Sequence, residues 1–209
     1  LQARIKSRPF YSILFKRAFN SEEITTEKAA MALAQFVRSV VSYRTKYDAA
    51  RAMVSSQLVP FPSFTAEENR GKDLYMIGDD GMRCVVCHGG ESFTSPGIRN
   101  NGLEAVSVDL GVGGITQNNY DMGMFKTPSL RSILLRPPYM HDGRFTTLAQ
   151  VIDHYNNGIK LSSTLDPALL NTTTNGLLLS AQDKADLEAF LRTLTDDDLL
   201  TNPAYASPF

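Results

Sequence analysis

The sequence predicts an all-α fold whose helices are joined by long irregular loops. Apolar residues recur at helical spacing in several stretches, and residues 26–43 form the longest of them. Thr65 and Thr147 each begin a capping box, in which a Glu or Gln follows three residues later. Residues 89–125 are dense in glycine, asparagine and proline and keep no period, which is typical of a long loop.

The expected helices follow one another along the chain. The first covers residues 11–19, and the second covers residues 26–43. On the second helix we expect one face to be buried in the core, formed by Ala29, Leu33, Phe36, Val37 and Val40. The later helices run from Thr65 through Tyr75, from Thr147 to the stop at Asn156-Asn157-Gly158, and from the cap at Ser180 to Leu194, where the last helix ends.

Both cysteines of the chain lie in one pentapeptide, Cys84-Val85-Val86-Cys87-His88. Two thiols at this spacing can each add to a vinyl group of haem, and the histidine that follows can bring its imidazole to the iron. The segment therefore predicts one covalently bound haem c, with His88 as the iron ligand on the near face.

A structural disulfide, half of a zinc site and a thiol redox pair are the alternatives for the two cysteines. Zinc would need two further ligands, and the other histidines, His141 and His154, lie far downstream without paired spacing. A thioredoxin-like pair would need a strand-rich setting, which the sequence does not predict. Haem c is therefore the favoured interpretation.

Length, charge and hydropathy narrow the class of protein. The 209 residues, of which 43% are hydrophobic, are enough for one domain with flanking segments. A formal net charge of -1 with mixed signs argues against nucleic acid or an anionic membrane as partner. No stretch is apolar for long enough to span a membrane, and residues 1–6 do not resemble a signal peptide. Because haem c is attached outside the bacterial cytoplasm, we expect a periplasmic protein whose signal segment was removed or lay upstream.

Several residues are candidates for the far face of the haem iron: Met122, Met124, Met140, His141, His154 and Tyr155. On the helix that begins at Thr147, Tyr155 falls on the apolar face, whereas its neighbour His154 lies about 100° around the helix. An inward tyrosine is equally well explained as a core residue whose hydroxyl bonds to backbone or to a propionate. The direction of Met140, in a turn after Pro137-Pro138, does not follow from periodicity.

Three downstream segments, taken with the haem motif, resemble the second, C-terminal haem domain of the bacterial dihaem cytochrome c peroxidase and MauG superfamily. They are Phe125–Arg131 (FKTPSLR), Pro138–Phe145 (PYMHDGRF) and Thr147–Gly158, which ends in Asp153-His154-Tyr155-Asn156-Asn157-Gly158. The resemblance extends over residues 24–194 with its motifs in the family's order. It implies a cytochrome c-like haem domain over residues 24–209 and, in residues 1–23, a linker or the tail of a preceding haem domain.

In that family the first haem domain reacts with peroxide, and the second haem is six-coordinate and collects or shares electrons. This chain has one haem motif and no tryptophan, the residue that joins the two haems in the family. The resemblance therefore implies the electron-transfer half of a periplasmic dihaem oxidoreductase that reduces peroxide or uses it to oxidise a partner protein. The expected partners are an N-terminal haem domain, missing or in a separate chain, a redox protein and a second copy of the chain. The alternative is a stand-alone monohaem electron-transfer cytochrome.

The resemblance also bears on the distal ligand, because MauG-like members carry tyrosine where the ordinary peroxidases carry methionine. Tyr155 stands at that position. A thioether favours ferrous iron, whereas an anionic phenolate favours the ferric and higher states. The resemblance thus favours Tyr155 as distal ligand and leaves Met140 as the main alternative.

Other site residues are expected in supporting roles. Arg131 and Arg144 are candidate partners of the haem propionates, since a guanidinium binds a carboxylate through two hydrogen bonds, although both are equally well explained as ordinary arginines. We expect His141–Asp142 to form a hydrogen-bonded turn at the haem edge. The resemblance implies that the backbone carbonyls of Arg136 and Pro138 are ligands of a calcium ion, which prefers oxygen.

Overall fold

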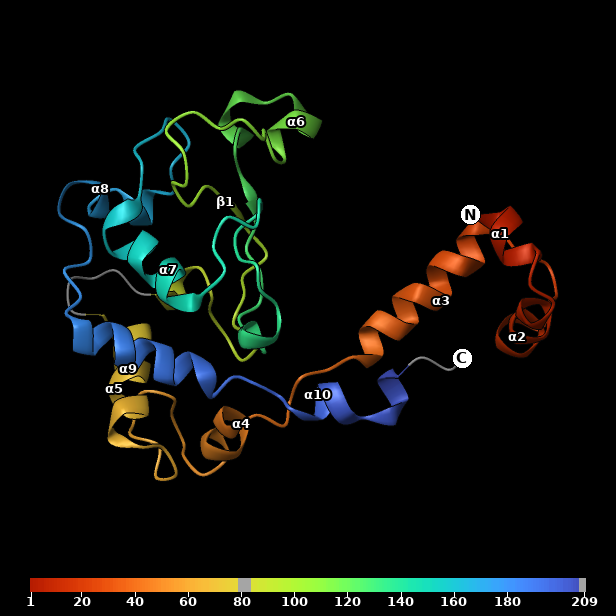
Figure 1. Ribbon diagram of the computed structural model, residues 1–209, viewed down its shortest axis with the longest axis horizontal. Helices are drawn as coiled ribbons and strands as arrows, with labels where there is room; N and C mark the ends of the chain where they lie inside the picture. Colours follow the sequence, from red (N-terminus) through yellow and green to blue (C-terminus); the bar gives the residue numbers. More distant parts are fainter. Residues whose placement is uncertain (79–83, 207–209) are drawn as a thin grey trace. The chain divides into compact units, whose positions relative to one another are not determined.

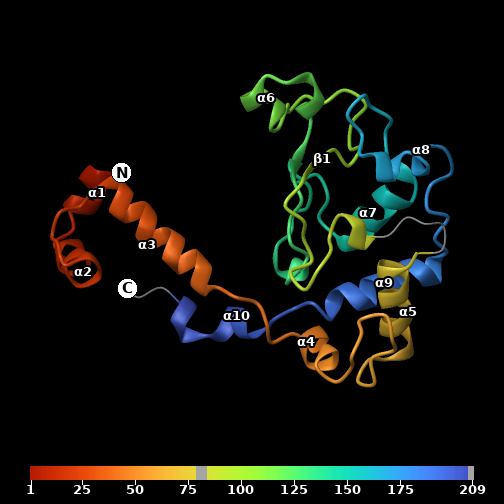
Figure 2. The same ribbon diagram turned by 180° about the vertical axis from the view of Figure 1, so that it is seen from behind.

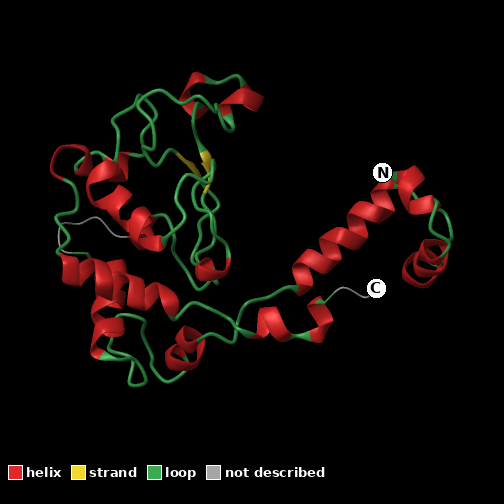
Figure 3. Cartoon of the chain, viewed as in Figure 1, coloured by secondary structure: helices red, strands yellow, loops and turns green. Residues whose placement is uncertain are grey.

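A computed structural model describes residues 1–78 and 84–206, and this part of the chain is mostly helical, as an all-α fold requires. The chain forms two compact units, one of Leu1–Ser42 with Leu199–Phe209 and one of Tyr43–Asp198. Figure 1 labels the elements, and Figure 3 distinguishes helices from loops. The expected boundary after residue 23 does not coincide with this division, and the origin of residues 1–23 in a preceding haem domain stays a prediction.

The first unit contains α1 (Gln2–Lys6), α2 (Phe10–Phe19) and α3 (Thr26–Ser39). Helix α3 begins where Thr25 accepts a hydrogen bond from the backbone N–H of Lys28. Phe15, Ile24 and Ala29 are buried together in a small core. The C-terminal segment of the unit includes the turn η6 (Pro203–Tyr205), and the Tyr205 hydroxyl donates to a carbonyl near the end of α3 at 3.0 Å.

The apolar side of α3 is exposed, so the expectation that it belongs to the core was wrong. Leu33, Phe36 and Val37 are 62%, 50% and 68% exposed, and Val40 is 39% exposed, although Ala29 is buried. Helical periodicity identifies a face that prefers to leave water, but it does not say what covers that face. We call Leu33, Phe36, Val37 and Val40 the α3 apolar face. An exposed row of this kind marks an interaction surface.

The second unit is organised around two helices, α5 (Ala66–Met76) and α9 (Ala181–Arg192), which pack directly against each other. They cross in both views of the chain (Figures 1 and 2). Their backbones approach closely at Gly71, where an added Cβ would lie 1.9 Å from the carbonyl oxygen of Asp186. Fully buried aromatic side chains surround the crossing: Tyr47 of α4 (Lys46–Arg51), Phe61, Tyr75, Phe93 and Phe190.

The helix starts predicted from capping residues are confirmed. The side chains of Thr65, Thr147 and Ser180 each form a complete capping box, with Glu68, Gln150 and Asp183 respectively. Helix α9 ends at Arg192, and α10 (Asp198–Thr201) follows it, so α9 is not the last helix as expected. A further capping box, at Thr45 with Asp48, begins α4, which the sequence analysis missed.

The long irregular loop is also confirmed, and it contains only short elements in its described part. After the turn η1 (Cys84–Val86), β1 (Ile98–Arg99) pairs with β2 (Phe125–Lys126) in antiparallel register, with Arg99 opposite Phe125. Two short helical pieces lie within residues 89–125: α6 (Gly113–Thr116) and η2 (Asn119–Asp121). Further short pieces follow outside that loop: η3 (Ile133–Leu135), η5 (Pro167–Leu169) and α8 (Thr172–Asn175). Helix α7 (Leu148–Asp153) continues into a π-helical turn, η4 (His154–Gly158).

None of the described helices combines the length and the apolar character needed to cross a bilayer.

Candidate functional site

The Cys84–His88 segment is a tight helical turn. The backbone N–H groups of Cys87 and His88 both donate to the carbonyl oxygen of Cys84, at 3.2 and 2.8 Å. Both thiols are free and half-buried rather than joined in a disulfide. Burial raises the pKa of Cys84 to about 11 and also raises the pKa of Cys87, so both are thiols at neutral pH. The turn presents two uncharged thiols and one imidazole together.

The His88 imidazole is oriented by a carbonyl oxygen from the loop after β2. Its Nδ1 lies 3.0 Å from the carbonyl oxygen of Pro128, which can only accept, so Nδ1 carries the proton. This leaves the lone pair on Nε2, the arrangement that metal-bound histidines use. Burial lowers the pKa of His88, which favours the neutral imidazole that ligation needs. The Tyr75 hydroxyl donates to the His88 carbonyl and ties the segment to α5.

Asn101 brings together three of the candidate distal residues. Its side-chain Nδ2 donates to the sulfur of Met140 at 3.3 Å, and its backbone carbonyl lies 3.0 Å from Nε2 of His154. Its side chain also hydrogen-bonds to Tyr155. Asn101 is positioned by a turn at the next residue, Gly102, which has a φ of 69°. The carbonyl oxygen of Gly102 accepts a hydrogen bond from the backbone N–H of Lys160 at 2.7 Å.

Tyr155 is close enough to the two cysteines for charge on them to affect its pKa. Burial raises the pKa of Tyr155 to about 12, the hydrogen bond from Asn101 opposes this rise, and charge on Cys87 or Cys84 would add to it. The phenol therefore stays protonated unless a cation lies nearby. The apolar side expected for this helix is confirmed within α7, since Leu148 and Ile152 are buried while Asp153 is exposed. It does not extend as expected to Tyr155, because the chain continues in a π-helical turn in which His154 is buried as well.

The other distal candidates have different surroundings. His141 is exposed and stacks on Phe125, with ring centroids 3.9 Å apart. His154 is buried, and burial lowers its pKa, but its Nε2 already faces the Asn101 carbonyl. The Met122 sulfur packs close to Gly113 of α6. Of the six candidates, Met140 and Tyr155 are the two whose side chains meet at the Asn101 amide.

The two arginines expected near the propionates are paired with carboxylates of the chain. Arg131 donates two hydrogen bonds to Asp48, at 2.8 and 2.9 Å, and a third to a backbone carbonyl. Arg144 pairs with Glu104 at 2.7 Å and with Asp142, which confirms a hydrogen-bonded turn after His141. A propionate role for either arginine stays a prediction that these contacts do not favour.

Arg99 is a candidate that the sequence analysis missed. It lies on β1, and its Nη1 donates to the buried Asp166 at 2.6 Å. The charge of Arg99 lowers the pKa of both Cys87 and His88, which places the guanidinium beside the motif. Neither Arg99 nor Asn101 belongs to a recognisable sequence motif. The asparagines that follow Arg99 predict a turn, but they do not predict which residues Arg99 and Asn101 contact.

The residues of this pocket fit a covalently bound haem. The thiols have the attachment spacing, the His88 Nδ1 is bonded to the Pro128 carbonyl, and the Asn101 side chain contacts both a phenol and a thioether. In addition, Nε of Arg99 is buried without a hydrogen-bond partner among the described residues, as a donor would be when its acceptor belongs to a bound group. Among the described residues, no group of three or more His, Cys, Asp or Glu side chains is arranged to hold a metal ion by itself.

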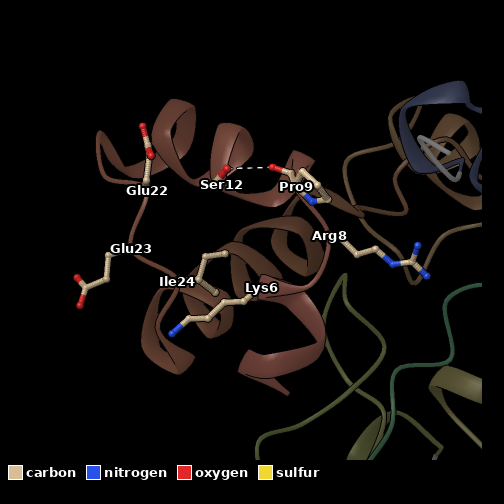
Figure 4. A pocket seen from close by; sticks show the side chains of 7 residues that line it. All are labelled: Lys6, Arg8, Pro9, Ser12, Glu22, Glu23 and Ile24. Carbon is tan, nitrogen blue, oxygen red and sulfur yellow. Dashed lines mark hydrogen bonds between the residues drawn. The ribbon is translucent and has the colours of Figure 1, made fainter.

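A hollow in the first unit has a different chemistry. Figure 4 shows its lining, which consists of Lys6, Arg8, Pro9, Ser12, Glu22, Glu23 and Ile24. The Ser12 hydroxyl donates to the Pro9 carbonyl at 2.9 Å, and Arg8 extends away from Lys6 (Figure 4). This lining has no thiol, imidazole or thioether, so it offers no group that could attach a haem or bind its iron.

Comparisons with known proteins point to one family. The profile of a family described as "Di-haem cytochrome c peroxidase" matches residues 1–54. The chain is 35% identical to the methylamine utilization protein MauG of Methylorubrum extorquens over 91% of this chain and 51% of the relative. It is 30% identical to the cytochrome-c peroxidase IdrP1 of Pseudomonas sp. (strain SCT) over 93% of this chain and 56% of that relative.

A solved structure agrees with these relatives. A MauG-like protein associated with microbial copper homeostasis superposes with a TM-score of 0.81 at 31% identity, over 99% of this chain and 64% of that chain. The chain thus spans about half the length of the curated relatives that it matches. With the attachment motif, the oriented histidine and these similarities taken together, the chain belongs to the bacterial dihaem cytochrome c peroxidase and MauG family.

Proposed function

We propose that this chain is the electron-transfer haem c domain of a periplasmic dihaem peroxidase or MauG-like oxidoreductase. The observation that carries the proposal is a single Cys-x-x-Cys-His motif in a chain that spans 51% of a MauG relative. The peroxide-reactive haem would then lie in an N-terminal half outside this sequence. When bound, the haem of this domain supplies a one-electron redox centre that exchanges electrons with that second site.

The chain's own residues have distinct tasks in this proposal. Cys84 and Cys87 form the thioether links, and His88 offers Nε2 because its Nδ1–H is held by the Pro128 carbonyl at 3.0 Å. Tyr155 is the proposed distal ligand, since the cation would offset the burial that now raises the pKa of Tyr155. Met140 remains the alternative ligand, because the Asn101 side chain contacts both its sulfur, at 3.3 Å, and Tyr155, so this contact does not distinguish the two.

Replacing Tyr155 with phenylalanine tests this assignment. We expect Tyr155→Phe to abolish the native ferric low-spin spectrum, because the ring stays in place while the ligand oxygen is removed. Met140→Leu, which keeps an apolar side chain of similar volume, should leave that spectrum intact. Absorption and EPR spectra of the haem-loaded protein provide the measurement. A methionine charge-transfer band in the parent that disappears in Met140→Leu would make Met140 the ligand and Tyr155 a core residue.

The function itself is tested on the natural full-length protein. We expect the reading frame to continue upstream into a second Cys-x-x-Cys-His, and mass spectrometry to find two covalent haems. Added hydrogen peroxide should oxidise the reduced haem of this domain through the other half. A natural protein with one haem that does not consume peroxide would instead be a stand-alone monohaem electron-transfer cytochrome.

The α3 apolar face supports the existence of the missing half. The side chains of Leu33, Phe36 and Val37 are 62%, 50% and 68% exposed. Apolar area left in water costs roughly 25 cal/mol per Å², so such a row favours a covering surface. We assign this surface to the N-terminal haem domain, and hydrogen exchange on the full-length protein should find the amides of α3 protected there.

Further partners follow from the same family membership. The carbonyls of Arg136 and Pro138 lie on an exposed stretch before Tyr139, where their oxygens suit a calcium ion shared with the other half. Metal analysis of the full-length protein before and after chelation tests calcium binding. A small redox protein would serve as electron donor or as oxidised substrate, and sedimentation tests whether two copies associate.

A further inference from the structure

The guanidinium of Arg99 has a buried nitrogen, Nε, that finds no partner among the described residues. Its Nη1 donates to Oδ2 of Asp166 at 2.6 Å, but its Nε is buried and donates to no described group. A buried donor of a charged group without an acceptor destabilises the fold, so native proteins rarely keep one. An acceptor from outside the chain is therefore expected at Nε.

The surroundings of Arg99 fix its orientation. Strand β1 holds its backbone opposite Phe125, and Asp166 is itself held by a hydrogen bond from the backbone N–H of Ala168 at 2.9 Å. Gly97 lies beside the guanidinium, since an added Cβ there would be in contact with Nε of Arg99 at 3.7 Å. The guanidinium is thus held through Nη1 and has Nε free to bind a second group.

The second group must be an anion at the attachment motif. Arg99 lies close enough to Cys87 and His88 for its charge to affect both. The Arg99–Asp166 pair is neutral overall, and the charge of Asp166 opposes that of Arg99 at Cys87, so a further anion would be bound mainly through the hydrogen bond from Nε. Ser95, earlier in the same loop, has a buried hydroxyl that also lacks a partner. A haem bound to Cys84 and Cys87 carries carboxylate groups at its edge, and a carboxylate accepts well from a guanidinium N–H.

We propose that Arg99, through Nε, binds a propionate of the haem and thereby sets its orientation and reduction potential, in place of the arginines expected from the sequence. Arg99 is a positioning residue in this role, since it does not reach the reacting atoms. The inference rests on the haem site proposed above, but it does not depend on whether Tyr155 or Met140 is the distal ligand.

The experiment compares haem-loaded Arg99→Gln and Arg99→Lys with the parent. Removing the positive charge in Arg99→Gln should shift the ferrous-to-ferric equilibrium about tenfold toward ferric, equivalent to ~59 mV for one electron. Arg99→Lys keeps the charge and can still pair with Asp166, so its potential should stay near the parent's. Both variants lose the planar Nε–H, so both should shift the propionate bending band in resonance Raman spectra.

Arg70→Gln is the matched control. Arg70 also bonds to a buried aspartate, with its Nε 2.7 Å from Asp186, but it lies on α5 and has no effect on the pKa of Cys87 or His88. Its removal should change neither the potential nor the Raman band. The inference is overturned if the potential of Arg99→Gln and the Raman bands of both variants match those of the parent. If Arg99→Gln does not fold, an unshifted Raman band in Arg99→Lys is enough to overturn it. Failure of the parent to carry covalent haem, counted by mass, would instead overturn the haem site itself.

Discussion

Replacing Cys84 and Cys87 together with serine is expected to abolish covalent haem attachment. A serine hydroxyl fits the space of each half-buried thiol but does not form the thioether. The haem would then be held only by the iron ligands and by contacts, so denaturation should release it completely. Each single variant should keep one thioether and therefore retain haem after denaturation. Mass spectrometry of the denatured protein measures the haem-bearing fraction, which should fall from nearly all to none in the double variant.

Val86→Ser provides the matched control for this experiment. Val86 lies between the two cysteines in the same turn, and its side chain is 47% exposed. The substitution introduces the same serine at a position where the motif requires no particular side chain, so haem attachment should be unchanged. Haem that stays covalently bound in the double cysteine variant would show that attachment uses other residues.

The parts of the fold that were predicted correctly depend on short-range chemistry. Thr65 and Thr147 cap their helices through residues three positions away, and the attachment motif spans five consecutive residues, so each signal is complete within a few residues of sequence. The irregular loop was predictable for the same reason, because glycine and proline impose local conformations. These features needed no knowledge of the tertiary fold.

The features that sequence analysis missed depend on contacts between distant segments. Arg131 was expected at the haem edge, but Asp48, 83 positions earlier, accepts two of its hydrogen bonds. Asn101 contacts Met140, 39 positions later, and Arg99 reaches Asp166, 67 positions later. The α3 apolar face was misplaced for a related reason, since a helical pattern does not reveal whether the covering surface belongs to the same unit. Such pairings follow from tertiary packing and not from spacing.

Substitution of Gly71 with alanine is expected to have the largest effect on folding stability. In most helix interiors this change is favourable by about 0.5–1 kcal/mol, because alanine loses less backbone entropy on folding. At Gly71 the new Cβ would lie 1.9 Å from the carbonyl oxygen of Asp186 and 2.9 Å from Cβ of Phe190. Backbone atoms of α9 must then move, which also strains the bonds from Arg70 to Asp186 at 2.7 and 3.2 Å.

The expected cost of Gly71→Ala is about 3 kcal/mol, the upper part of the range for overpacked cores, because the clash is with backbone and not with a flexible side chain. For a chain of this size, this corresponds to a fall in Tm of about 6–12 °C, measured by thermal unfolding of the haem-loaded protein. Gly114→Ala on α6 is the control, since its added Cβ would meet its nearest neighbour at 3.4 Å and the residue is exposed. That variant should be neutral or slightly stabilised. Equal Tm values for the two variants would contradict a close approach of the α5 and α9 backbones at Gly71. They would also mean that the aromatic core around Phe190 tolerates a wider separation of the two helices than its close packing implies.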